Sequence, residues 1–297
     1  MILTYREAIR EGMSIRMRED PRVILFGEDT GAYGGSFGIT LGMYDEFGGD
    51  RVRDTPISES AIIGCAVGSA ATGMRPIAEL VFCDFLTVAM DQIANQAAKM
   101  RYMFGGKISL PMVVRMPAGA GQGGAAQHSQ SLEAWVTHVP GLKVVYPSTP
   151  QDALGLILSA IDDDNPVIYF ENKIIKEKAD ITNFDPIPLG KGNIVREGTD
   201  ISVITYGLQV YDAKKAADIL AKDGISLEII DLRTLYPLDK DMIRSSIAKT
   251  HHAIVITEET KRGGYGGEIS ATIAEEMFDE LDGPVVRIGS LNTPVPV

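Results

Sequence analysis

Several features are scarce in this 297-residue chain, and each scarcity excludes a class of protein. Its two cysteines, Cys65 and Cys83, are too few for a disulfide framework or a cysteine-rich zinc site. No apolar run approaches the roughly 18 residues of a membrane-spanning helix, and charged residues stand where a signal peptide needs an apolar stretch. Because both cysteines have apolar neighbours, we expect buried, reduced thiols and a cytoplasmic protein.

Basic charge is also in short supply. The chain has 28 lysines and arginines against 40 aspartates and glutamates, a net charge of −12. Such an acidic chain repels nucleic acid and anionic lipid unless it has a basic patch, and here the basic residues are scattered. We therefore expect neither nucleic acid nor a membrane as a partner. The apolar share of 45% and the charged share of 23% exclude a disordered, collagen-like or coiled-coil chain.

Helix-like and strand-like segments alternate through the first 175 residues. Thr4 and Glu7 form a capping-box pattern that opens a helix, which Pro21 should end near Asp20. Further helices are predicted over 58–72, over 84–103 and from Pro150, and strands over 23–26, 76–82, 112–116, 143–146 and 166–170. The seven glycines of residues 31–49 predict a long surface loop.

A second alternation begins after a segment of mixed charge and proline that has no periodicity. It predicts strands over 201–205, 227–231, 253–257 and 285–288, and helices over 210–221, 239–248 and 268–280. The fold class is therefore α/β, with two parallel sheets that each lie between helices. We predict one domain over residues 1–175, a linker over 176–192 and a second domain over 193–297.

Residues 119–124 match the pattern G-x-G-x-x-G of dinucleotide-binding loops. A predicted strand precedes them, but residues 125–131 are a poor helix start and residues 139–147 contain no acid for a ribose hydroxyl. A nucleotide-binding dehydrogenase is therefore kept only as an alternative. No G-x-S-x-G segment indicates a serine hydrolase, and no histidine–glutamate group has zinc-ligand spacing.

Two polar residues have both a structural and a functional interpretation. Glu59 begins a helix of small residues, where an acid complements the helix dipole but also points a carboxyl at any ligand that binds there. His128 follows the glycine-rich loop among polar residues, a position that favours proton transfer to a substrate. The other three histidines are typical structural imidazoles. The acidic run 162–164 fits either a hard-cation loop or a solvated helix end.

Seven segments occur in order along the chain: 55–59, 73–79, 91–93, 101–106, 126–131, 140–145 and 231–235. Together they closely resemble the beta subunit of the thiamine diphosphate-dependent E1 component of 2-oxo acid dehydrogenase complexes. The pyruvate and acetoin branches look nearest. The resemblance implies a transketolase-like pyrimidine-binding domain followed by a transketolase C-terminal-type domain, which agrees with the alternation above.

The same resemblance implies roles for individual residues. Glu59 would bond N1′ of the cofactor's aminopyrimidine, and a shared proton there favours the imino tautomer. The 4′-imino group can then take the thiazolium C2 proton, and the resulting ylid attacks the substrate carbonyl. Phe85 would lie beside the pyrimidine, and His128 would handle protons of the substrate or assist acyl transfer to lipoyl-lysine.

Further pocket and ion positions follow from the resemblance alone. Other cofactor-pocket positions match Glu28, Ile57, Ser58 and Val81. A potassium ion would be held by main-chain oxygens, a donor set that leaves no side-chain signature; the matching residues are Met112, Ala160, Ile161, Asp163 and Asn165.

The chain lacks one motif that enzymes with this cofactor usually carry. They hold the diphosphate through Mg²⁺ on a G-D-G segment, whereas here Gly49 and Asp50 are followed by Arg51. We therefore expect an alpha subunit to supply the Mg²⁺ and diphosphate half of the site in an α2β2 heterotetramer. The resemblance also implies a helical tail, which in the family normally begins about where this sequence reaches Val297.

The predicted function is that of an E1 beta subunit. With its alpha subunit it would decarboxylate pyruvate or another 2-oxo acid oxidatively, or cleave acetoin, and pass the acyl group to the lipoyl acyltransferase E2. A non-catalytic cofactor-half or assembly subunit is the second alternative, beside the nucleotide-binding dehydrogenase.

Overall fold

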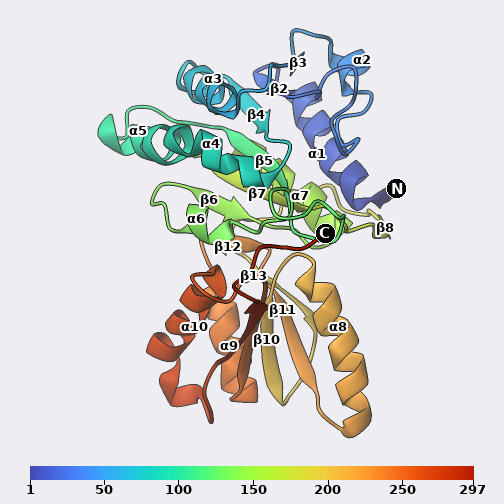
Figure 1. Cartoon of the computed structure of the whole chain (residues 1–297), viewed down its shortest axis with the longest axis vertical. Coiled ribbons are helices and arrows are strands. Elements are labelled where there is room, and N and C mark those ends of the chain that lie inside the picture. The colour runs from blue at the N-terminus through green and yellow to red at the C-terminus, as the bar shows by residue number, and fades with distance from the viewer.

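Two separate sheets organise the chain, one above the other in Figure 1. The computed structural model describes residues 1–297. The 7-stranded sheet has the spatial order β12 (Thr234–Tyr236), β6 (Lys143–Val145), β7 (Val167–Asn172), β5 (Val113–Ala118), β4 (Arg75–Glu79), β2 (Val23–Gly27) and β3 (Val52–Asp54). The 5-stranded sheet has the order β14 (Val286–Ser290), β13 (Ala253–Thr260), β10 (Ile201–Thr205), β11 (Leu227–Asp231) and β9 (Asn193–Arg196).

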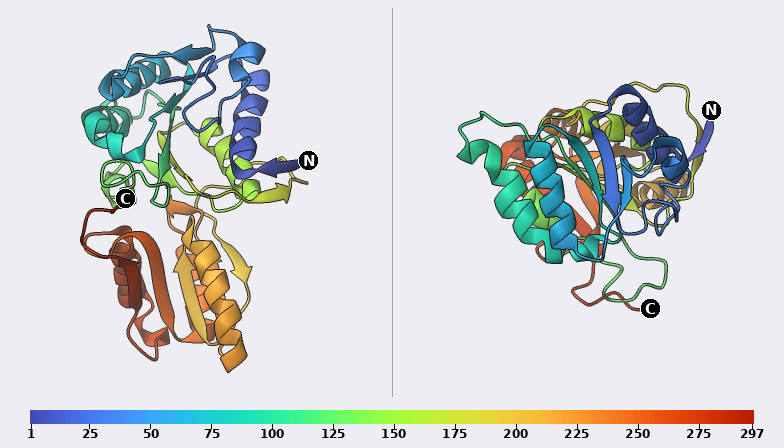
Figure 2. Two further views of the ribbon diagram at one scale, coloured as in Figure 1. Left: turned by 45° about the vertical axis from the view of Figure 1, so that its right-hand side comes forward. Right: turned by 90° about the horizontal axis from the view of Figure 1, so that it is seen from above.

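Helices cover both faces of each sheet, as the two views of Figure 2 show. Around the larger sheet lie α1 (Tyr5–Glu19), α2 (Met43–Phe47), α3 (Glu59–Ala71), α4 (Leu86–Asp91), α5 (Ala98–Met103), α6 (Glu133–Thr137) and α7 (Pro150–Asp162). Around the smaller sheet lie α8 (Gln209–Leu220), α9 (Lys240–Thr250) and α10 (Tyr265–Glu276). Short 3₁₀ turns occupy Cys83–Phe85, Ala221–Asp223 and Phe278–Glu280. None of these helices combines the length and the apolar character that crossing a membrane requires.

The α/β class and the mostly parallel pairing predicted from the sequence are confirmed. The local signals hold at the first helix, where the Thr4 side chain and Glu7 cap each other and Asp20 ends the helix. They also hold at α7, where Thr149 accepts a hydrogen bond from the Asp152 backbone and Pro150 takes the first turn.

Two predictions about elements were wrong. The single helix expected over 84–103 is interrupted by a π-helical turn at Gln92–Ala97, which a 3.6-residue period does not reveal. The surface loop expected over 31–49 contains α2 and packs buried residues against α1. Within the predicted linker, β8 (Lys178–Asp180) pairs antiparallel with β1 (Ile2–Thr4). Strands of three residues are too short to show alternation.

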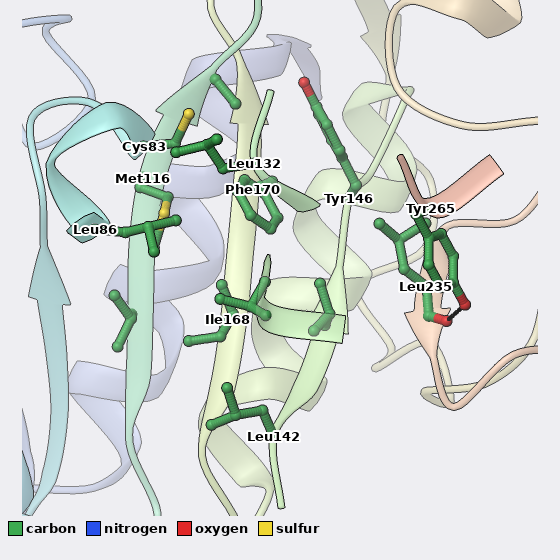
Figure 3. Packing of buried hydrophobic residues seen from close by; sticks show 14 of the residues in the cluster. Cys83, Leu86, Met116, Leu132, Leu142, Tyr146, Ile168, Phe170, Leu235 and Tyr265 are labelled. Carbon is green, nitrogen blue, oxygen red and sulfur yellow. Dashed lines mark hydrogen bonds between the residues drawn. The ribbon is translucent and has the colours of Figure 1, made fainter. Parts of the chain in front are cut away.

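The two halves of the chain share one apolar core. Tyr146 of the larger sheet layer stacks on Phe170, with ring centroids 5.6 Å apart, and lies equally close to Tyr206 of the smaller one. Figure 3 shows Tyr265 beside Leu235, whose carbonyl accepts the tyrosine hydroxyl. Because β12 comes from the second half and pairs with β6 in the larger sheet, the halves are joined by backbone hydrogen bonds as well as by packing.

Candidate active site

The residues predicted to bind the cofactor follow the carboxyl ends of four adjacent strands. Glu28 follows β2, residues 57–59 follow β3, residues 81–85 follow β4, and His128 follows β5. These strands are neighbours and run parallel, so their carboxyl ends meet at one edge of the larger sheet. In open α/β sheets, ligands bind at this edge.

Glu59 is the first residue of α3, and its N-cap Ser58 makes no side-chain cap. The residue is only 8% exposed, and no donor of the chain bonds its carboxyl. The unpaired backbone N–H groups of the first helical turn favour a negative charge at this position. A buried carboxyl of this kind has its hydrogen-bonding capacity free for a ligand.

Glu28 is half-buried close to Glu59. Burial, followed by the charges of Glu59, Asp29 and Glu79, raises the pKa of the Glu28 carboxyl. Glu28 therefore holds a proton more readily than a solvent-exposed glutamate does.

His128 lies in an aromatic cluster. Its ring centroid is 4.6 Å from that of Phe82 and 5.5 Å from that of Phe85, in edge-to-face arrangements. The structure thus brings together the predicted Phe85 and His128. Sequence reasoning missed Phe82, although its place three residues before Phe85, in the segment that follows β4, was a usable signal.

The remaining predicted pocket residues differ in exposure. Val81 is buried after β4, whereas Ile57 is 81% exposed in the loop that leads into α3. Two cavities of the chain lie away from Glu59. One of 790 Å³ lies beside α6, β12 and α10, and one of 600 Å³ lies between residues 126–132 and the end of β13. Beside Glu59, residues 56–58 and 60 are exposed.

The glycine-rich segment 119–124 does not open a helix. It forms turns and bends, with positive φ at Gly119, Gly121 and Gly123. A dinucleotide fingerprint needs a helix N-terminus directly after the loop. This geometry counts against the nucleotide-binding alternative.

A buried charge cluster lies beneath the site, and the sequence analysis did not predict it. Arg115 of β5 is fully buried and bonds Glu79 of β4, and its other terminal nitrogen lies 3.1 Å from Glu171 of β7. Burial raises the pKa of Glu171 to about 7, against the lowering effect of Arg115. The three residues are far apart in sequence, and only the strand order brings them together.

The predicted potassium oxygens lie at the opposite, amino edge of the larger sheet. Arg75 donates to the carbonyl oxygens of Ile161 at 2.9 Å and Asp163 at 3.3 Å, and the carbonyl of Met112 accepts the Val167 N–H. The structure therefore brings Ile161 and Asp163 together, but around a guanidinium. No group of histidine, cysteine, aspartate and glutamate side chains has a metal-binding arrangement.

The two halves of the chain match two family models. Residues 2–176 match "Transketolase, pyrimidine binding domain" and residues 190–297 match "Transketolase, C-terminal domain". A solved structure described as "Split gene transketolase, inactive beta4 tetramer" superposes with a TM-score of 0.82, covering 98% of this chain and 90% of that one. At 21% identity it shows the fold alone. The fold and the site edge define a two-domain, transketolase-like α/β protein.

Relatives of known name are similar over nearly the whole chain. The 2-oxoisovalerate dehydrogenase subunit beta of Bacillus subtilis is 46% identical, covering 99% of this chain and 90% of the relative. The acetoin:2,6-dichlorophenolindophenol oxidoreductase subunit beta of Cupriavidus necator is 48% identical with the same coverage. The pyruvate dehydrogenase E1 component subunit beta of Rickettsia bellii is 44% identical, covering 100% and 92%. The chain belongs to this thiamine diphosphate-dependent family of E1 beta subunits.

Proposed function

We propose that this chain is the beta half of a heteromeric E1 enzyme. With an alpha subunit it decarboxylates a 2-oxo acid such as pyruvate oxidatively, or cleaves acetoin, and the acyl group passes to lipoyl-lysine of an E2 acyltransferase. One observation carries the proposal: the carboxyl of Glu59, a residue only 8% exposed, has no donor in this chain and lies at the carboxyl edge of the sheet, where α/β proteins bind ligands.

The residues at this edge fit the aminopyrimidine part of thiamine diphosphate. When bound, that cofactor supplies an electron sink for the carbanion left by cleavage next to a carbonyl. Glu59 would hold a proton at N1′ of the pyrimidine, while Val81 and Phe85 would provide its apolar walls. Glu28, with its raised pKa, supplies a second proton-holding group beside Glu59. His128 would move a proton at the substrate.

The remaining half of the site would come from the alpha subunit. The proposal assigns to it the Mg²⁺ and the diphosphate, in an α2β2 assembly. Ile57, which is 81% exposed beside Glu59, is the apolar contact that the proposal assigns to that subunit.

Potassium does not fit the five predicted carbonyls as they stand, because Arg75 already donates to two of them. The ion therefore stays a prediction from the resemblance. The domain limits of 1–175 and 193–297, with a linker between them, are likewise proposed, supported by the separate sheets. A cytoplasmic location is proposed from the two free thiols, Cys65 and Cys83.

The test is turnover of the full chain mixed with an alpha subunit, thiamine diphosphate and Mg²⁺, with pyruvate, acetoin and branched 2-oxo acids as substrates. Glu59→Gln should lower kcat by at least about 100-fold, since it removes a group that holds a proton. It should leave association with the alpha subunit unchanged.

Glu275→Gln, on the exposed face of α10, is the matched control and should retain full turnover. Full activity in Glu59→Gln would remove the role assigned to that carboxyl. Inertness of the wild-type chain with every alpha subunit that binds it would instead favour the non-catalytic assembly subunit.

A further inference from the structure

The loop that carries His128 is held by a buried lysine. Lys173 directly follows β7 and is only 2% exposed. Its amine donates a hydrogen bond to the main-chain oxygen of His128 and lies 5.1 Å from the centre of the Phe82 ring. One cation therefore contacts both the backbone of His128 and the aromatic ring that packs on the His128 imidazole.

The position of this amine is costly, which indicates a purpose beyond packing. Burying an ammonium group requires strong partners, yet the Lys173 amine forms none of the ion pairs of the chain, and its one hydrogen bond goes to the loop. Burial lowers the pKa of the Lys173 amine, and the nearby Cys83, Asp84 and Glu258 act in the opposite direction.

Glu258 of β13 holds the same loop from the other half of the chain. Its carboxylate accepts the Ala120 backbone N–H at 2.7 Å and the Asn172 side-chain amide at 3.1 Å. Gly119 approaches this carboxylate so closely that a Cβ atom would lie 2.7 Å from Oε1, and its φ of +89° suits only glycine. The loop is therefore shaped to meet Glu258.

A third set of contacts closes the loop on itself and on its base. The Gly119 N–H donates to the Gln130 carbonyl, and both the backbone and the side chain of Gln130 donate to Asp84. Ala125, between these anchors, has a φ of +50°. A non-glycine residue adopts this left-handed conformation when the surrounding structure imposes it.

We propose that Lys173 and Glu258 form a clamp that fixes the position of His128, with Lys173 acting from beneath the loop and Glu258 from the second half of the chain. Both are positioning residues, and the proposal rests on the function proposed above for His128. A displacement of about 1 Å at a reacting group is enough to cost on the order of 100-fold in rate. The second half of the chain would thus control the chemistry without contributing a residue to the binding edge.

The first arm of the test measures the loop itself in the full chain, without any turnover. Amide hydrogen exchange of residues 119–130 should become at least about 10-fold faster in Lys173→Met and in Glu258→Ala. Lys173→Arg should restore slow exchange, because a guanidinium can also donate to the His128 carbonyl. Lys176→Met and Glu275→Ala, at exposed positions, are the matched controls and should behave as the wild type.

The second arm measures turnover with the alpha subunit. Lys173→Met should lower kcat about 10- to 100-fold and change KM for the 2-oxo acid by less than about 3-fold, with Lys173→Arg recovering most of kcat. Its melting temperature should be unchanged or higher, because a buried ammonium is replaced by an apolar side chain. Unchanged exchange of residues 119–130 in both Lys173→Met and Glu258→Ala would overturn the clamp, whatever the turnover.

The two proposals fail in different ways. A wild-type chain without thiamine-dependent turnover would contradict the proposed function, and the exchange arm would still decide whether the clamp exists. Loss of kcat in Lys173→Met without faster exchange would show that Lys173 acts by another route, and would also overturn the clamp.

Discussion

The carboxyl and amino edges of the larger sheet satisfy their polar groups in different ways. At the carboxyl edge, the Glu59 carboxyl has no donor from the chain and the pKa of Glu28 is raised by burial and by neighbouring acids. At the amino edge, Arg75 bonds Asp164 and the Ile161 carbonyl, and Lys143 pairs with Asp163. The Glu59 carboxyl lacks a partner that the chain could have supplied, whereas these polar groups of the amino edge have theirs.

Within a single sheet, the carboxyl edge therefore has a binding role and the amino edge a structural role. Polar groups whose hydrogen bonds and ion pairs are made within the chain require no ligand or partner subunit. The contacts at the amino edge therefore need only a structural explanation. Groups left incomplete in a buried position are costly unless a ligand or another subunit completes them. The carboxyl edge is therefore where the cofactor and the alpha subunit should act.

The largest effect is expected where the carboxyl edge is supported from below. Arg115→Met leaves Glu79 and Glu171 facing each other without their shared cation, and breaking a buried pair of this kind costs about 3–5 kcal/mol. Urea unfolding should show this fall in the free energy of unfolding, most strongly above pH 7, where Glu171, with a pKa of about 7, is ionised. The exposed Arg22 is the control: Arg22→Met should lie within about 0.5 kcal/mol of the wild type. A stable Arg115→Met chain would show that the cluster is not what supports this edge.

A smaller effect is expected at the amino edge. Arg75→Ala removes a partly exposed ion pair and two hydrogen bonds to carbonyls, which should cost about 1 kcal/mol. Turnover of the enzyme mixed with its alpha subunit should stay unchanged, because the substitution lies at the edge remote from Glu59. Added potassium should restore stability if the freed carbonyls can hold that ion. If Arg75→Ala lost turnover while its free energy of unfolding stayed at the wild-type value, the two edges would not differ in role.

The smallest effect on stability is expected at the exposed surface of the carboxyl edge. Ile57→Ser should change the free energy of unfolding of the chain by less than about 0.5 kcal/mol, since the side chain is exposed. It should weaken association with the alpha subunit by about 10-fold, because an apolar contact at a covered surface is lost. Urea unfolding of the chain alone measures the first quantity, and titration calorimetry or sedimentation of the mixture measures the second. Unchanged association would place the interface elsewhere.

The local elements were predictable where a signal lies within a few residues. The capping box of Thr4 and Glu7 marks the start of α1, and the strand predicted over Leu227–Asp231 has the bounds of β11. Proline and threonine at 149–150 likewise marked the start of α7. At the two helix starts the capping hydrogen bonds join residues three positions apart, so the sequence window contains the cause.

Features that depend on distant partners were not predictable. The pairing of Arg115 with Glu79 and Glu171 follows from the order of β4, β5 and β7 in the sheet, and the contact of Lys173 with His128 joins residues 45 positions apart. The roles of Glu28, Ile57, Ser58 and Val81 came from resemblance, because no spacing rule selects them. The structure adds that they follow adjacent strand ends, which a composition or a period cannot show.

The three residues of β12 have a consequence for how this chain is made. They lie at positions 234–236 and complete the edge of a sheet whose other strands all end by residue 172. During synthesis, the first sheet must therefore wait for more than 60 further residues to leave the ribosome before its last strand can dock. A fragment that ends between the halves would leave β6 as an unpaired edge strand, with which a strand of another molecule could pair.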